Sequence, residues 1–248
     1  MSALLLGKLP ATRPHGLRDL VEYSNGPLPT PPPSVAVPKV AEWQMFANGP
    51  DPSCTVEGAP FGDCVMAGAA HRIMASDVEV KRQDAVPSSN TVAEQYLTLT
   101  GGADTGLNES DTLAFWRSQG LFGDNKIAAY CPVATDQLTH VQASVALYGA
   151  CFLGIQVPES AQEQFGRNEP WTVVPGSPIM GGHCIVVVGY SPEYLFAVTW
   201  GGIAPLSYSW FQTFCDESYA VITEEIAEAG DGPSGLNLAA LSHDLDAL

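Results

Sequence analysis

The clearest deficit of this sequence is positive charge, since its 248 residues include only 10 lysines and arginines against 27 aspartates and glutamates. The formal net charge of −17 disfavours binding to nucleic acids and to anionic membrane surfaces, because both attract clustered cations. Long apolar runs are missing too, as no stretch approaches the roughly 18 residues that a membrane-spanning helix needs. Residues 1–8 contain a short apolar stretch with no basic region before it. We therefore expect no membrane partner and no secretory signal peptide.

Cysteines at metal-binding spacing are also absent. The six cysteines lie at positions 54, 64, 131, 151, 184 and 215, and without a secretory signal we expect them to be reduced. Cys54 and Cys64 are not spaced like the close pairs of structural zinc sites. No glycine-rich phosphate loop follows a predicted strand. The sequence thus implies neither a metal nor a cofactor, and Cys151 and Cys184, which lie in apolar runs, are expected in the core.

The periodicity of the apolar residues changes near residue 150, which divides the chain into four parts. Residues 1–40 form an extended, proline-rich arm that acts as a strap or spacer. A helical half-domain follows at 41–150, then a β-rich half-domain at 151–225 and an acidic tail at 226–248. Helices first and strands second predict an α+β fold. The cation-rich arm and the acidic tail either dock on each other, pack on neighbouring copies, or remain as two solvated ends.

Apolar spacing and capping residues give the positions of the individual elements. Helices are predicted at 64–74, 91–97, 111–120 and 139–149, the third of them capped by Ser110 or Asp111. Strands are predicted at 150–157, 184–190, 195–200, 206–210 and 219–222.

A cysteine at the start of a predicted helix is the first candidate for chemistry. Asp63 precedes Cys64 as a natural N-cap, and the positive end of the helix dipole favours a thiolate at Cys64. Gly62 allows the backbone of a substrate to approach closely, and the Cys64 N–H points toward a developing oxyanion. Taken alone, a cysteine at a helix start is more often structural than catalytic.

A histidine at the head of an apolar strand is the second candidate. His183 follows two glycines and precedes the run 184–190, so its ring is held by a rigid element with space beside it. A general base needs this arrangement, and the order cysteine-helix then histidine-strand predicts a pair of Cys64 and His183. His71, two helical turns after Cys64, is expected to pack rather than to act as the base. Trp200 and Trp210 are expected in the core or as a shield for the histidine.

These motifs resemble the papain-type cysteine peptidases. The resemblance rests on four segments: Gly62-Asp-Cys64, the run from Gly181 to Tyr190, Val198-Thr-Trp-Gly201 and Tyr208-Ser-Trp210. The sequence is still more similar to a papain-like group of bacteriophages and bacterial genomes. That group shares the segments Gly7 to Arg13, Phe115-Trp-Arg117 and Cys215 to Val221, so the resemblance covers nearly the whole chain. It implies a papain-like fold, Cys64 as nucleophile and His183 as base.

Two positions depart from the pattern of the family. Where papain-like enzymes have a glutamine that donates to the oxyanion, this chain has Gly58 beside Glu57. Losing one such donor lowers the rate on the order of 10²–10³-fold. Where the family has an asparagine that orients the histidine, this chain has Val198, and the neighbouring Thr199 substitutes for it only in a different strand register. Asn48 is a further candidate for either role after a rearrangement of its loop.

The resemblance and its departures leave two main functions open. The first is a papain-like thiol hydrolase, encoded by a phage, that cleaves a peptide or amide bond in a peptide or protein substrate. The second is a catalytically degenerate copy of this fold that serves as a structural protein of a phage virion, with other virion proteins or copies of itself as partners. A cell-wall amidase is a third hypothesis, without a wall-binding repeat to support it. The expected location is the cytoplasm of the bacterial host or the virion.

Overall fold

One antiparallel sheet of six strands, in the order β1-β6-β2-β3-β4-β5, organises the molecule. The structure is a computed structural model that describes residues 4–49, 51–80, 86–228 and 235–248. Its strands are β1 (Ile127–Pro132), β2 (Cys151–Pro158), β3 (Ile179–Tyr190), β4 (Tyr194–Thr199), β5 (Gly202–Ser207) and β6 (Cys215–Thr223). Its helices are η1 (Leu20–Tyr23), α1 (Cys64–Val80), α2 (Ser89–Leu99), α3 (Glu109–Ser118), α4 (Leu138–Tyr148), α5 (Glu159–Gly166), α6 (Tyr208–Phe214), α7 (Glu224–Glu228) and α8 (Leu238–Asp246). Helices combined with an antiparallel sheet confirm the predicted α+β class.

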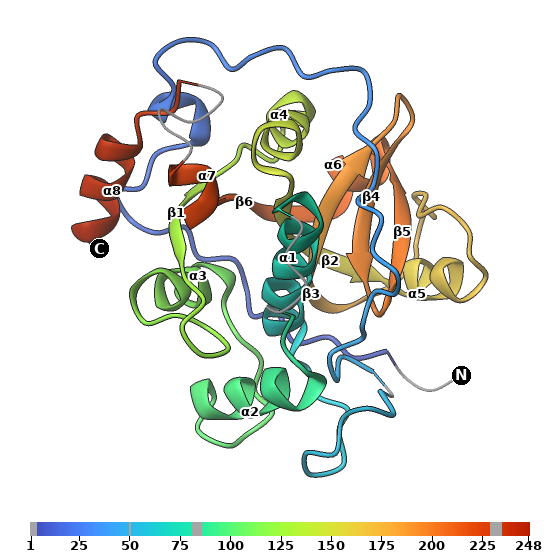
Figure 1. Cartoon of the computed structure of the whole chain (residues 1–248). Helices are drawn as coiled ribbons and strands as arrows, with labels where there is room; N and C mark the ends of the chain where they lie inside the picture. Colours follow the sequence, from blue (N-terminus) through green and yellow to red (C-terminus); the bar gives the residue numbers. More distant parts are fainter. Residues whose placement is uncertain (1–3, 50, 81–85, 229–234) are drawn as a thin grey trace.

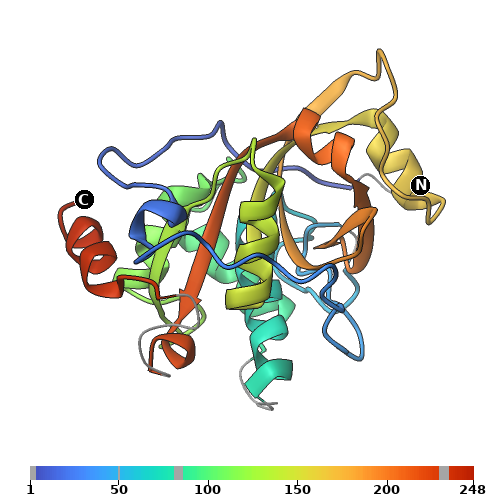
Figure 2. The same cartoon turned by 90° about the horizontal axis from the view of Figure 1, so that it is seen from above.

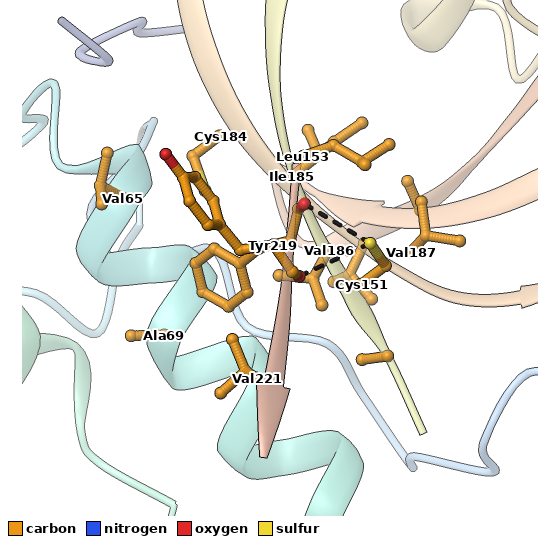
Figure 3. Packing of buried hydrophobic residues seen from close by; sticks show 14 of the residues in the cluster. Val65, Ala69, Cys151, Leu153, Cys184, Ile185, Val186, Val187, Tyr219 and Val221 are labelled. Carbon is orange, nitrogen blue, oxygen red and sulfur yellow. Dashed lines mark hydrogen bonds between the residues drawn. The ribbon is translucent and has the colours of Figure 1, made fainter. Parts of the chain in front are cut away.

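Helix α1 is the central helix and packs on β3 (Figure 1). Residues 61–75 are all buried, which fits a sequence that is rich in alanine, methionine and valine on every side of the helix. Gly68 faces the Cys184 sulfur and the Phe152 ring so closely that a side chain at this position would displace them. Val65 and Ala69 of α1 belong to the same buried hydrophobic cluster as the side chains of the sheet (Figure 3). This close contact between α1 and β3 fixes the start of the helix against the middle of the strand.

The cysteines of the sheet are small core residues, as predicted. Cys151 and Cys184 are buried, and all six cysteines of the chain are free thiols. The Cys151 sulfur lies 3.5 Å from the carbonyl oxygen of Tyr219, on the neighbouring strand β6 (Figure 3).

Four local predictions were wrong. Strand β1 lies within residues 41–150, where only helices were expected, because its partner β6 is nearly 90 residues away and local periodicity carries no trace of that pairing. Residues 208–210 begin α6 rather than a strand, since the Ser207 hydroxyl accepts the Trp210 N–H and caps a helix. The cap of α3 is Asn108 instead of Ser110 or Asp111. His183 lies inside β3 and not at its head, because the strand begins at Ile179.

The arm and the acidic tail pack on the body of the protein. Residues 25–40 cross the end of α4 and run down beside β4 (Figures 1 and 2), where Val35 bridges Tyr190. Of the three alternatives for the charged ends, docking on each other is present, since Arg18 forms an ion pair of 3.0 Å with Asp244 of α8. Within the described part of the chain, no helix combines the length and the apolar character needed to span a bilayer.

Candidate active site

Cys64 is the first residue of α1, and its side chain is covered by the arm. It is only 1% exposed, and its sulfur accepts the Cys184 N–H at 3.4 Å. Gly62, two residues before it, passes so close to the arm that a Cβ on Gly7 would collide with the Gly62 backbone, and a Cβ on Gly62 would collide with the Leu6 carbonyl oxygen. The close backbone approach expected at Gly62 therefore occurs, and in this structure the approaching segment is the chain's own arm.

The arm is held over Cys64 by backbone hydrogen bonds on both sides. Lys8 N–H donates to the Gly182 carbonyl at 3.1 Å, and Leu9 N–H donates to the Leu107 carbonyl at 2.9 Å. In return, Leu107 N–H donates to the Gly7 carbonyl at 2.9 Å. Residues 7–9 thus connect β3 with the loop that precedes α3 through isolated β-bridges at Lys8, and they lie over the thiol.

His183 lies opposite the start of α1 and is held on two sides. Its Nε2 is 2.7 Å from Thr199 Oγ1, and its ring stacks on the Trp200 indole at a centroid distance of 4.5 Å and an angle of 17°. Val198, at the position of the family's asparagine, is fully buried in the core and pairs with Val186 of β3. The hydroxyl that contacts the imidazole therefore comes from Thr199, one residue further along β4.

Both members of the expected catalytic pair are uncharged in this arrangement. Burial raises the pKa of Cys64 to about 12, and smaller hydrogen-bond contributions from the N–H groups of Cys184 and Gly7 act in the opposite direction. Burial likewise lowers the pKa of His183 to about 3. No hydrogen bond joins these two described side chains, and His183 Nδ1 is buried without a partner. The loss of solvation under the arm outweighs the helix dipole, which by itself favours a thiolate.

The residues around the expected oxyanion position differ in whether they can donate a hydrogen bond. Gly58 lies in an exposed turn at φ 73° with no atom within 4 Å of where a side chain would be, and it supplies no donor. Asp63 is fully buried, and burial raises its carboxyl pKa well above the usual range, opposed by the amide of Asn48 beside it. Both Asp63 oxygens lack a hydrogen-bond partner, so the predicted side-chain cap of α1 is not formed. The remaining donor from the predicted set is the Cys64 N–H at the helix start.

A cluster of charged side chains under the arm was not foreseen. Lys8 Nζ lies 2.9 Å from Glu217 Oε1 and 3.1 Å from Asp216 Oδ1, and the lysine side chain is fully buried. Glu109, the first residue of α3, is also fully buried, and burial followed by the nearby Glu217 raises its pKa well above the usual range. The sequence contained part of this signal, because Lys8 lies in the segment Gly7 to Arg13 and Glu217 in the segment Cys215 to Val221, and both segments were singled out from the sequence. No feature of the sequence near Glu109 indicates that this residue joins the buried cluster.

The histidine of α1 packs as predicted. His71 is buried between Trp43 and Phe46, and its Nε2 lies 2.6 Å from the Gln44 carbonyl oxygen. Burial lowers its pKa to about 4. Among the residues that the structure describes, no three His, Cys, Asp or Glu side chains are grouped to bind a metal ion. A groove of about 700 Å³ is lined by Trp43, Ser89 and Trp200, among other residues.

The arrangement of these elements is shared with known structures, although neither a protein-family model nor a curated protein sequence matches the chain. Xylellain, a cysteine protease from Xylella fastidiosa, superposes with a TM-score of 0.65 at 15% identity, over 90% of this chain and 98% of that one. The chain has the papain-like cysteine protease fold. ProCathepsin B S9 from Trypanosoma congolense matches with a TM-score of 0.57 at 12% identity, over 89% and 87% of the two chains.

A third papain-like structure extends the comparison to an insect enzyme. Digestive procathepsin L 3 from Tenebrio molitor matches with a TM-score of 0.55 at 11% identity, over 85% of this chain and 75% of that one. Because the identities are so low, these matches show the papain-like fold, while the chemistry of this chain depends on its own residues.

Proposed function

We propose that this chain is a thiol hydrolase of papain-like fold that cleaves peptide or amide bonds, with Cys64 as nucleophile, His183 as general base and Thr199 as the residue that orients the imidazole. The observation that carries the proposal is the setting of His183. Thr199 engages its Nε2 and Trp200 covers one face of the ring, so Nδ1 is the nitrogen left to take a proton. The next residue, Cys184, touches the Cys64 sulfur.

The proposed reaction begins when the arm withdraws from Cys64. Access of water and substrate removes the burial that now keeps thiol and imidazole neutral. His183 Nδ1 then accepts the thiol proton, the sulfur attacks the carbonyl carbon of the substrate, and the Cys64 N–H donates to the oxyanion. His183 returns the proton to the leaving amine, and a water molecule, deprotonated by His183, hydrolyses the thioester and regenerates the free thiol.

The motifs shared with phage and bacterial sequences support a phage-encoded protein. On this proposal the protein is made in the cytoplasm of a bacterial host and acts there or in the virion. Its substrate is then a peptide or a protein.

A second candidate is a degenerate papain-like fold that serves as a structural component of a virion. The specific observation in its favour is the oxyanion corner, where Gly58 offers no side-chain donor and lies in an exposed turn. The neutral pair of Cys64 and His183 is also consistent with a scaffold that has no activity. In this case the partners are other virion proteins or further copies of the chain.

Alkylation of Cys64 separates the two candidates. Iodoacetamide is applied at about pH 6 to the full-length protein and to Lys8→Ala, which loosens the arm, and the label on each cysteine is located by mass spectrometry. We expect slow labelling of Cys64 in the wild type and at least roughly tenfold faster labelling in Lys8→Ala, together with cleavage of a peptide library. The partly exposed Cys54 is the internal control, since its labelling should not change.

Three variants test the assigned roles in the loosened protein. Cys64→Ser should abolish peptide cleavage, and Thr199→Val should lower kcat by about 10²-fold while Thr199→Ser retains most of it. The hydrolase proposal fails if the Lys8→Ala protein is folded, its Cys64 reacts with iodoacetamide no faster than an ordinary cysteine, and the protein cleaves no peptide. Detection of the protein in purified phage particles would then support the structural candidate.

A further inference from the structure

We propose that the pocket now filled by Lys8 is the specificity pocket of the cleft and that it binds a lysine or arginine side chain of the substrate peptide. This inference rests on the proposed hydrolase function, and it assigns that function a substrate class. In this reading Lys8 occupies the pocket as an internal stand-in for the substrate residue.

The position of the Lys8 backbone is the first argument. Its N–H donates to the carbonyl of Gly182, the residue directly before His183, while Gly7 lies against Gly62 and faces the Cys64 sulfur. A peptide that presents a carbonyl group to this sulfur has to pass through the same space. The side chain of one of its residues close to the scissile bond therefore enters the pocket where the Lys8 side chain now lies.

The charges of the pocket are the second argument. Lys8 Nζ contacts Glu217 and Asp216 at 2.9 and 3.1 Å and also donates to the Leu9 carbonyl at 3.2 Å. The Lys8 side chain is fully buried, and the Glu217 side chain is 7% exposed. If Lys8 leaves and no other cation enters, these carboxylates lose their counter-charge in a poorly solvated site. A basic side chain of a substrate restores the counter-charge, whereas an apolar or acidic side chain does not.

The shape of the pocket is the third argument. Gly154 of β2 forms one wall, and a Cβ at this position would collide with Lys8 Cε and with Glu217 Cγ. The absence of a side chain at Gly154 creates the space through which the aliphatic part of lysine reaches the carboxylates. The pocket is therefore matched to a long, unbranched cationic side chain in both length and charge.

A binding test that needs no catalysis uses full-length Lys8→Ala with n-propylammonium, which reproduces the atoms that the substitution removes. We expect n-propylammonium to raise the Tm of this variant by at least ~3 °C in a concentration series, and n-propanol to leave it unchanged. The double variant Lys8→Ala/Glu217→Gln should lose most of this rescue. Lys8→Ala/Glu163→Gln is the matched control, because Glu163 is an exposed glutamate of α5. No rescue of Lys8→Ala by the cation, or equal rescue by n-propanol, would overturn the proposal.

A substrate test completes the experiment. Peptides that differ only in having lysine, norleucine or glutamate at the varied position are hydrolysed by Lys8→Ala, and we expect kcat/KM to be at least about 10²-fold higher for lysine than for norleucine. Glu217→Gln, which retains Lys8, should reduce this preference at least tenfold and provides a second variant if Lys8→Ala does not fold. Hydrolysis without a preference for lysine refutes the pocket alone. Absence of all hydrolysis refutes the hydrolase function, and n-propylammonium then still decides whether the pocket binds a cation.

Discussion

Two buried clusters of ionisable groups lie side by side under the same short segment of the arm, and they differ in whether their groups are charged. At the pair of Cys64 and His183, the pKa of the thiol is raised to about 12 and that of the imidazole lowered to about 3, so both groups are neutral. In the pocket of Lys8, the nearby Glu217 and Asp216 outweigh the effect of burial and raise the pKa of the ammonium group. One cluster contains no charge, and the other contains a buried ion pair.

The difference shows that the counter-charge, rather than the depth of burial, decides which buried groups are ionised. The arm supplies a cation to the pocket through Lys8, while it offers the thiol only backbone N–H groups. A segment with a neutral residue in place of Lys8 would cover Cys64 equally well but leave the pocket unbalanced. Three substitutions test this role of the counter-charge: one in the pocket of Lys8, one at a buried neutral imidazole and one at an exposed ion pair.

The largest effect is expected from Lys8→Met, which retains the length of the side chain and removes its charge. Removing one partner of a buried ion pair leaves Glu217 uncompensated, and we expect the free energy of unfolding to fall by about 3–5 kcal/mol in urea denaturation. Lys39→Met is the matched control, because Lys39 is exposed and should change stability very little. A loss below about 1 kcal/mol for Lys8→Met would mean that a carboxyl of the pocket simply takes up a proton.

A smaller effect is expected from His71→Gln, which replaces a buried neutral imidazole with an amide that does not titrate. The folded state holds the pKa of His71 at about 4, whereas the unfolded chain titrates near 6.5, so the unfolded state binds more protons between these values. Stability from this residue is complete above about pH 6.5 and decreases as the pH falls toward 4, by up to ~1.4 kcal/mol per pH unit.

The measurement compares the unfolding free energies of the wild type and His71→Gln between pH 7 and pH 5. Glutamine can still donate to the Gln44 carbonyl, and the stability of the variant should depend less steeply on pH than that of the wild type. Parallel pH profiles of the two proteins would show that His71 is not held neutral by burial.

The smallest effect is expected from Arg18→Ala, ten residues further along the same arm than Lys8. Its ion pair with Asp244 is exposed to solvent, and Tyr23 continues to donate to the same carboxylate at 2.9 Å. We expect thermal unfolding in moderate salt to be indistinguishable from that of the wild type. A clear loss of stability would contradict the expectation that the buried ion pair of Lys8 stabilises the protein while the exposed ion pair of Arg18 does not.

The sequence predicted those features that depend on local patterns. The start of α1 at Cys64 follows from a helical run after a polar residue, and the apolar run after His183 predicts most of β3. The register that brings Thr199 to His183 could not be settled in advance, because it depends on how β4 pairs with β3. The pocket of Lys8 was missed for the same reason, since Lys8 and Glu217 are 209 positions apart in the sequence and meet only in the folded chain.

The connection between the arm and the body affects how Cys64 and the pocket of Lys8 become accessible to a substrate. The covering segment ends at Leu9, and residues 10–19 join it to η1, which begins at Leu20. This short tether also contacts the body, because the Pro10 carbonyl accepts a hydrogen bond from Asn108 and Leu17 is buried. A ligand on such a tether is present at an effective concentration on the order of millimolar or higher, and dilution of the protein does not release it. A substrate therefore has to displace the arm from the site against this high effective concentration. A single cut within residues 10–19 would turn the permanent competitor into a peptide that dissociates and is lost to the bulk solution.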